Sequence, residues 1–236
     1  MQIDAQEFGR FYEAPIGQVA RRLILRRFRL VWPDVKGARV LGYGFATPYL
    51  RTMIGEAERV IAAMPAQQGA AAWPETRNLT VLTDEDAFPF PDAMFDRIVV
   101  VHGLETADAV RPLMRQIWRV LAPAGRLVVV VPNRLSLWTQ VDRSPFAQGR
   151  PYSRSQLDLL LRESLFVAEH WDTALLFPPL KRRRLVRTGT NWERAGRMLW
   201  PRLAGVHVVE ASKSLYALAA PPPARGRKAV LTPARA

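Results

Sequence analysis

Two unbroken apolar runs limit most strongly what this chain can fold into. Residues 98–101 read IVVV and residues 127–131 read LVVVV. A strand with one wet face would alternate polar and apolar residues, whereas continuous runs are typical of parallel strands that helices cover on both faces. Because 49% of the 236 residues are hydrophobic, the chain can bury such a core in one domain.

The segments around these runs alternate between strand and helix patterns. In chain order they are 12–31 (helix), 39–43 (strand), 48–54 (helix), 58–63, 78–82 and 95–101 (strands), 108–121 (helix) and 126–131 (strand). This order predicts an α/β fold, a Rossmann-like, doubly wound, mostly parallel sheet with helices on both faces. Two later stretches, 166–177 and 206–218, predict an antiparallel edge pair and bring the sheet to seven strands.

The chain divides into three predicted parts. Residues 1–34 form an N-terminal helix that packs on the core, and residues 35–218 form the sheet domain. Residues 219–236 contain PPPARGRKAVLTPARA, a basic, Pro-rich stretch that predicts a disordered tail. No stretch has the roughly 20 apolar residues that span a bilayer, and the first residues carry no apolar signal region. We therefore expect a cytoplasmic protein.

Positive charge is concentrated near the C-terminus. The formal net charge is +13, and residues 181–236 hold 13 Lys and Arg against only Glu193 and Glu210. The cluster Lys181-Arg182-Arg183-Arg184 and the tail predict contact with nucleic acid or another acidic partner. An ordinary solvated, arginine-rich surface explains the same pattern equally well.

A glycine turn follows the first expected strand. Residues 40–50 read VLGYGFATPYL, in which Gly42 and Gly44 let a ligand approach the backbone. Ligands of open α/β sheets bind beyond the carboxyl ends of the strands, which is where this turn falls. It matches only half of the dinucleotide pattern, and Met64-Pro65 stands where a nicotinamide site would have an acid. A nicotinamide oxidoreductase is therefore a distant alternative.

Two later stretches carry a family resemblance. Residues 82–105 read LTDEDAFPFPDAMFDRIVVVHGLE, and residues 113–133 read LMRQIWRVLAPAGRLVVVVPN. Over roughly residues 35–170 the chain resembles the class I S-adenosylmethionine-dependent methyltransferases of the type 11 group, with a degenerate first motif. The resemblance implies S-adenosyl-L-methionine as cofactor and methyl transfer as the reaction.

The resemblance also assigns cofactor contacts by position. The turn Gly42, Tyr43, Gly44, Phe45 and Ala46 would underlie the methionine part of the cofactor, although Gly42 replaces the acid that holds the ammonium. Met64, followed by Pro65, replaces the acid that binds the ribose, for which Gln67 or Gln68 is a substitute. The remaining contacts implied are Asp84 to the adenine amine, Glu85 beside the ring, and His102 of the HGLE segment beside the methionine arm.

The methyl acceptor is less defined. His102 is the candidate base, with Asp142 and Tyr152 as weaker ones. The residues expected beside the acceptor are Asn133, Arg134, Trp138, Phe146 and Tyr152, although the three aromatic ones fit an ordinary core equally well. The chain lacks the N-P-P-[YF] segment of adenine-amine methylators and has no cysteine nucleophile, so we expect a small-molecule acceptor rather than nucleic acid. No metal site is expected. The alternative is a catalytically inactive member of the fold whose basic C-terminal third binds nucleic acid or an acidic protein.

Overall fold

The computed structural model describes residues 4–69, 71–141, 144–177, 179, 196 and 200–214. Its helices are α1 (Ala5–Glu13), α2 (Pro15–Val31), α3 (Thr47–Leu50), α4 (Val110–Val120) and α5 (Arg154–Glu163). Its strands are β1 (Arg39–Gly44), β2 (Arg59–Pro65), β3 (Thr80–Thr83), β4 (Phe95–Val101), β5 (Leu121–Pro132), β6 (Phe166–Ala174) and β7 (Val206–Lys213).

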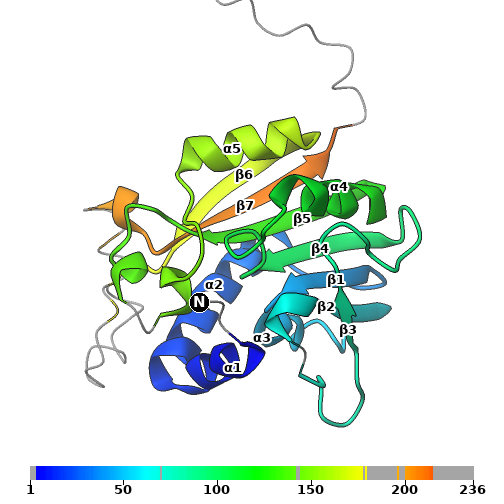
Figure 1. Ribbon diagram of the computed structural model, residues 1–236, viewed down its shortest axis with the longest axis horizontal. Helices are drawn as coiled ribbons and strands as arrows, with labels where there is room; N and C mark the ends of the chain where they lie inside the picture. The colour runs from blue at the N-terminus through cyan, green and yellow to red at the C-terminus, as the bar shows by residue number, and fades with distance from the viewer. Residues whose placement is uncertain are drawn as a thin grey trace, which may run out of the picture.

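These strands form one sheet in the order β3-β2-β1-β4-β5-β7-β6 (Figure 1). The strands β1 to β5 pair in parallel, and β7 lies antiparallel between β5 and β6. The predicted doubly wound sheet and its antiparallel edge pair are therefore confirmed. Chain order reverses between β1 and β4, so the carboxyl ends of these two strands form the switch point where such sheets bind ligands.

Helices cover both faces of the sheet, which explains the unbroken apolar runs. Figure 1 shows α1, α2 and α3 on one face and α4 and α5 on the other. Along β4, Val99 and Val101 belong to the core on the α2 side, whereas Ile98 and Val100 belong to the core on the α4 side. Every residue of the run is therefore buried, whichever way it points.

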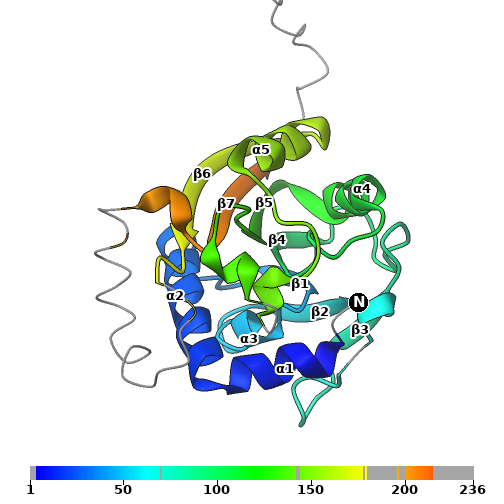
Figure 2. The ribbon, with the colours of Figure 1, turned by 60° about the vertical axis from the view of Figure 1, so that its left-hand side comes forward.

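The N-terminal segment forms two helices rather than the single one expected from Tyr12. Asp4 caps α1 by accepting a hydrogen bond from the Gln6 backbone N–H. Ala14 is extended because it precedes Pro15, and that extended residue separates α1 from α2. The chain turns at this point, so that α1 lies crosswise to α2 and below α3 (Figure 2).

Several element ends differ from the expected ones. Helix α4 begins at Val110 rather than Asp108, β5 begins at Leu121 rather than Arg126, and β6 ends at Ala174 rather than Phe177. The capping box of Ser153 and Gln156 at the start of α5 is present as expected. The basic cluster 181–184 and the tail 219–236 lie outside the described residues. No helix within the described ranges is long and apolar enough to cross a membrane.

Candidate functional site

The glycine turn lies at the switch point, but its backbone is tightly packed. Gly44 has a φ of +78°, and a Cβ atom there would lie 2.4 Å from the Val101 carbonyl oxygen. A Cβ atom on Gly42 would lie 2.5 Å from Leu50 Cδ1 and 2.8 Å from Ala46 Cβ. The acid missing at position 42 is therefore not simply replaced by a smaller residue. Leu50 and Ala46 occupy the space into which such a side chain would extend.

Aromatic side chains cover the carboxyl ends of β1 and β4. We call Phe8, Tyr12, Phe45 and Phe146 the aromatic cap. Phe8 stacks on Phe45 with 5.1 Å between ring centroids, and its ring is 4.8 Å from that of His102. On another side Phe146 lies 4.9 Å from His102. No member of the cap is more than 7% exposed, so α1 closes this end of the sheet with its apolar face.

A chain of buried hydrogen bonds runs beneath the cap. The Tyr12 hydroxyl is 2.9 Å from the Tyr49 hydroxyl and 2.8 Å from His102 Nε2, while His102 Nδ1 is 3.1 Å from Glu105 Oε1. Burial is the largest cause that raises the pKa of Tyr12, and burial likewise raises the pKa of Tyr49. Both phenols are therefore neutral donors. Glu105 Oε2 is buried without a hydrogen-bond partner among the described residues.

His102 has an unusual backbone conformation as well as buried partners. Its φ is +53°, a left-handed value that few residues other than glycine adopt. Such residues cluster at functional sites, where the surrounding structure holds them in place. The structure thus brings the predicted base to the end of β4, adjacent to the turn after β1, but it places the imidazole under α1.

At the end of β2 the structure confirms no substitute for the missing ribose acid. Met64 is 2% exposed and is covered along with Pro65. Gln68, one of the two proposed substitutes, donates its side-chain amide to the His102 carbonyl and the Thr106 hydroxyl. Gln68 therefore links β2 to the loop after β4. Gln67 is exposed.

The two acids after β3 have separate roles. Glu85 is 6% exposed, and its carboxylate accepts hydrogen bonds from the backbone N–H groups of Asp108 and Ala109 at 3.0 and 2.6 Å. Glu85 thus holds the backbone immediately before α4, which begins at Val110 rather than at the expected Asp108. Asp84 is exposed at the end of β3, where its carboxylate is accessible to a ligand.

The predicted acceptor residues are only partly together. Asn133 pairs with Tyr152 in an isolated bridge and donates its side-chain amide to the Arg202 and Ala204 carbonyls. The Tyr152 hydroxyl donates to the Leu104 carbonyl, and burial raises the pKa of Tyr152 to about 12. Trp138 is buried against Phe146 and Phe177, whereas Arg134 is exposed. The predicted acceptor residues therefore do not line one common wall. Asp142, the weaker base candidate, lies outside the described residues.

Sequence reasoning missed α1 as part of this site. Phe8 and Tyr12 are four residues apart, a spacing that puts both on one face of a helix, and Asp4 is a typical N-cap residue. These signals were present in the first 12 residues. They predict a helix, but they do not say which surface that helix covers.

The comparisons with known proteins agree with this geometry. Residues 41–129 match the family model described as a methyltransferase domain. The structure resembles that of an S-adenosylmethionine-dependent methyltransferase from Thermotoga maritima, a possible histamine N-methyltransferase, with a TM-score of 0.61 at 17% identity over 89% of this chain and 96% of the other. The chain therefore contains a stretch similar to a methyltransferase domain, and it has the fold of S-adenosylmethionine-dependent methyltransferases.

Two further similar proteins are informative. The demethylmenaquinone methyltransferase of Thermus thermophilus is 34% identical over 94 residues, which are 40% of this chain and 36% of the relative. Burkholderia thailandensis 1,6-didemethyltoxoflavin-N1-methyltransferase, solved with its acceptor and S-adenosylhomocysteine, gives a TM-score of 0.52 at 16% identity over 86% of this chain and 79% of the other. The chain spans less than half the length of the curated relatives that it matches first.

In this arrangement side chains cover the place where methyltransferases hold the cofactor. Residues 42–46 are buried, as are Met64 and His102, and Phe8 of α1 lies against both Phe45 and His102. Two carboxylate anchors are missing as well. The residues present therefore do not fit the cofactor while α1 remains in place.

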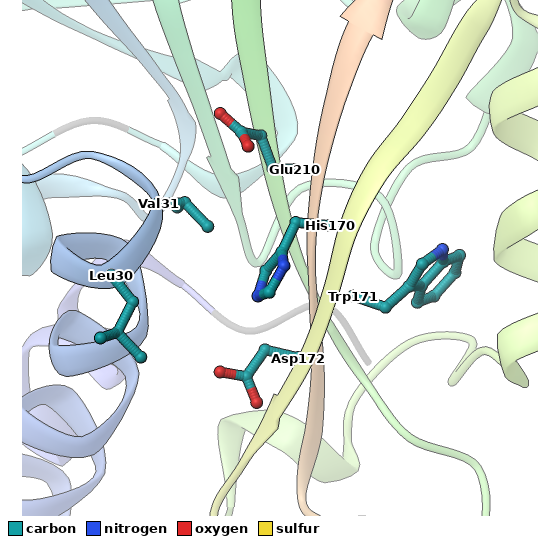
Figure 3. A pocket seen from close by; sticks show the side chains of 6 residues that line it. All are labelled: Leu30, Val31, His170, Trp171, Asp172 and Glu210. Carbon is teal, nitrogen blue, oxygen red and sulfur yellow. The ribbon is translucent and has the colours of Figure 1, made fainter.

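A separate hollow of about 630 Å³ lies on the α2 face of the sheet edge (Figure 3). Its walls include Leu30 from the end of α2, His170 and Asp172 from β6, and Glu210 from β7. Glu210 accepts a hydrogen bond from the Trp32 indole, and Asp172 forms an ion pair with Arg27. This hollow is remote from the glycine turn along the sheet order.

Proposed function

We propose that this chain is a methyltransferase that uses S-adenosylmethionine and transfers the methyl group to a small molecule. The observation that carries this proposal is the methyltransferase-domain match over residues 41–129, whose glycine turn ends β1 at the switch point of the sheet. Two of the similar proteins are named for their acceptors, demethylmenaquinone and 1,6-didemethyltoxoflavin, and both acceptors are small molecules. These names support a small acceptor here.

The proposal requires that α1 leave the strand ends. Because α1 is joined to α2 through the extended residue Ala14, rotation at one residue would remove Phe8 and Tyr12 from the cap. When a ligand binds only the open conformation, its apparent affinity is reduced by the fraction of molecules that are open. The cofactor is therefore expected to bind weakly to the full chain and to stabilise an arrangement different from the closed one.

His102 and Glu105 remain our candidates for a base. In the closed arrangement Tyr12 holds His102 Nε2, and Glu105 orients the ring through Nδ1. Removal of Tyr12 would leave Nε2 facing the place where an acceptor would lie. An imidazole oriented by a carboxylate is a common way to accept a proton from a hydroxyl or amine.

Thermal unfolding with S-adenosylhomocysteine tests the proposal. A ligand that binds only the folded protein raises the melting temperature as its concentration grows. We expect such a rise with S-adenosylhomocysteine, and no comparable rise with adenosine monophosphate as a nucleotide control. Equal responses to both compounds, or no response to either, would contradict the proposed cofactor.

A second function is favoured by the aromatic cap itself. A filled site that lacks its two acids fits a family member that has lost catalysis. For this alternative we infer that the basic residues 181–184 and the tail bind nucleic acid or an acidic protein. Nucleic-acid affinity would then fall steeply with salt, and S-adenosylhomocysteine would have no effect on melting. A cytoplasmic location stays a prediction in either case.

A further inference from the structure

A second cavity lies at the carboxyl end of β5, on the face opposite α2. Its volume is about 470 Å³, within the range of pockets that hold small molecules. The residues of its wall that carry the argument are Asn133, Ser153, Arg154, Trp171, Arg202 and His207. Figure 3 shows Trp171 pointing away from α2, in contrast to its neighbours His170 and Asp172, which face α2.

The cavity has an excess of positive charge. Arg154 and Arg202 line it, and neither guanidinium has an ion-pair partner within the described part of the chain. The Arg154 guanidinium lies 4.8 Å from the centre of the Trp171 ring, which holds the side chain at the cavity wall. Asp172 also contributes to the lining, but its charge is compensated by Arg27, which is 3.5 Å away.

The N-terminus of α5 adds to this charge. Ser153 caps the helix, which has ten residues and no acid in its first turn. The capping box satisfies the backbone N–H groups of Ser153 and Gln156, but no acidic side chain in the first turn offsets the partial positive charge of the helix start, where Ser153 and Arg154 line the cavity. Carboxylates and phosphates are stabilised in such an environment.

His207 supplies an independent sign that a ligand is missing. It is 8% exposed, it lines the cavity, and its Nε2 atom has no hydrogen-bond partner among the described residues. Burial lowers the pKa of His207 to about 4, so the imidazole is neutral at neutral pH, and Nε2 either donates or accepts a hydrogen bond. A hydroxyl group can serve as the missing partner in both cases.

We propose that this cavity binds a small organic anion that also carries a hydroxyl or amino group. The carboxylate or phosphate would lie between Arg154, Arg202 and the start of α5, and the hydroxyl or amino group would bind His207 Nε2. Trp171 would contact the hydrocarbon part. Asn133 of the wall is also one of the predicted acceptor residues, but no wall residue belongs to the glycine turn or the aromatic cap, so binding at this cavity can be measured without the cofactor.

Three matched probes test the site by NMR titration of the full chain without cofactor. Mandelate carries both a carboxylate and a hydroxyl, phenylacetate lacks the hydroxyl, and 1-phenyl-1,2-ethanediol lacks the carboxylate. We expect mandelate to bind several-fold more tightly than phenylacetate and roughly tenfold or more tightly than the diol. Equal affinities, or no binding of mandelate, would overturn the proposal.

Variants locate the binding. The double variant Arg154→Ala and Arg202→Ala should weaken mandelate binding about tenfold or more. The control Arg115→Ala, which removes an exposed arginine of α4, should leave the affinity for mandelate unchanged. His207→Phe should lower the affinity for mandelate to that for phenylacetate, and it should leave the affinity for phenylacetate unchanged. Equal losses in the Arg115 control, or an unaffected double variant, would contradict the site.

A second readout does not require a His207 variant to fold. The ring resonances of His207 should shift with mandelate and stay in place with phenylacetate, since only mandelate offers a hydroxyl group to Nε2. Unchanged His207 resonances at saturating mandelate would overturn the contact between the hydroxyl group and His207. Melting with S-adenosylhomocysteine, measured on the same samples, reports the cofactor site separately.

Discussion

His207 shows how burial of one imidazole affects the stability of the whole chain. Burial is the largest cause that lowers its pKa from 6.5 to about 4, and the nearby Arg154 charge adds to it. The unfolded chain therefore binds more protons than the folded chain between these two values. Stability is fully present above about pH 6.5 and is lost as the pH falls toward 4.

We expect this one group to contribute about 3 kcal/mol to the free energy of unfolding between pH 7 and pH 4. Urea denaturation at several pH values measures it. His207→Asn should flatten the pH dependence in this window, although other groups still titrate. A variant with the same slope as the parent between pH 4 and 6.5 would show that His207 is not the group responsible.

Gly44 is required by backbone geometry, whether or not a cofactor binds. Gly44→Ala would introduce a Cβ atom 2.4 Å from the Val101 carbonyl at a φ of +78°. We expect a loss of roughly 2–5 kcal/mol in the free energy of unfolding. Gly37→Ala is the control, since Gly37 has a φ of +67° but no atom within 4 Å, and should cost only about 1–2 kcal/mol. Equal losses at both positions would contradict the close packing.

At the scale of elements, the two acids that follow β3 differ, because Glu85 binds the backbone ahead of α4 and Asp84 is exposed. Glu85 accepts two backbone N–H groups ahead of α4, whereas the neighbouring Asp84 is exposed. We expect Glu85→Ala to cost about 1–3 kcal/mol of stability and Asp84→Ala to stay within about 0.5 kcal/mol. Chemical denaturation compares them. A larger loss for Asp84→Ala than for Glu85→Ala would reverse these roles.

The link between α1 and the sheet depends on one hydroxyl. Tyr12→Phe leaves His102 Nε2 and the Tyr49 hydroxyl without their buried partner, so we expect a loss of about 1–3 kcal/mol in the free energy of unfolding. Tyr43→Phe is a matched control, because the buried Tyr43 hydroxyl has no partner in the described ranges. That control should be neutral or stabilising. A Tyr12→Phe variant as stable as the parent would remove the basis for this link.

The elements themselves were largely predictable, but the position of α1 was not. Apolar periodicity and Pro15 indicated α2, and continuous apolar runs indicated β4 and β5. The start of α4 could not be predicted from local sequence. Glu85, which is distant in the sequence, binds the backbone just before this helix, so no neighbouring residue marks where the helix begins. The covering of the strand ends by Phe8 and Tyr12 is a tertiary contact that helical spacing alone does not specify.

At the scale of the whole molecule, sequence order predicted the sheet but not the state of its site. Helices alternating with apolar strands allow few topologies, and the preference for right-handed connections limits them further. The glycine turn was correctly expected at that reversal. Whether the space above it is open depends on side chains from four separate segments, among them Phe8 and Phe146, and no single motif contains that information.

The proposed function and the closed site are joined by one equilibrium. If α1 must leave before the cofactor binds, then a substitution that weakens the closed state strengthens binding by the same free energy. Tyr12→Phe, with a loss of about 1–3 kcal/mol, should therefore tighten binding roughly five- to 150-fold. A chain that never opens would show no such gain.

Calorimetric titration of S-adenosylhomocysteine into the full chain and into Tyr12→Phe tests this claim most directly. We predict saturable, one-site heat for both proteins, with the lower dissociation constant for Tyr12→Phe. No heat from either protein at millimolar ligand, under conditions in which both are folded, would contradict the proposed cofactor and the proposed opening of α1.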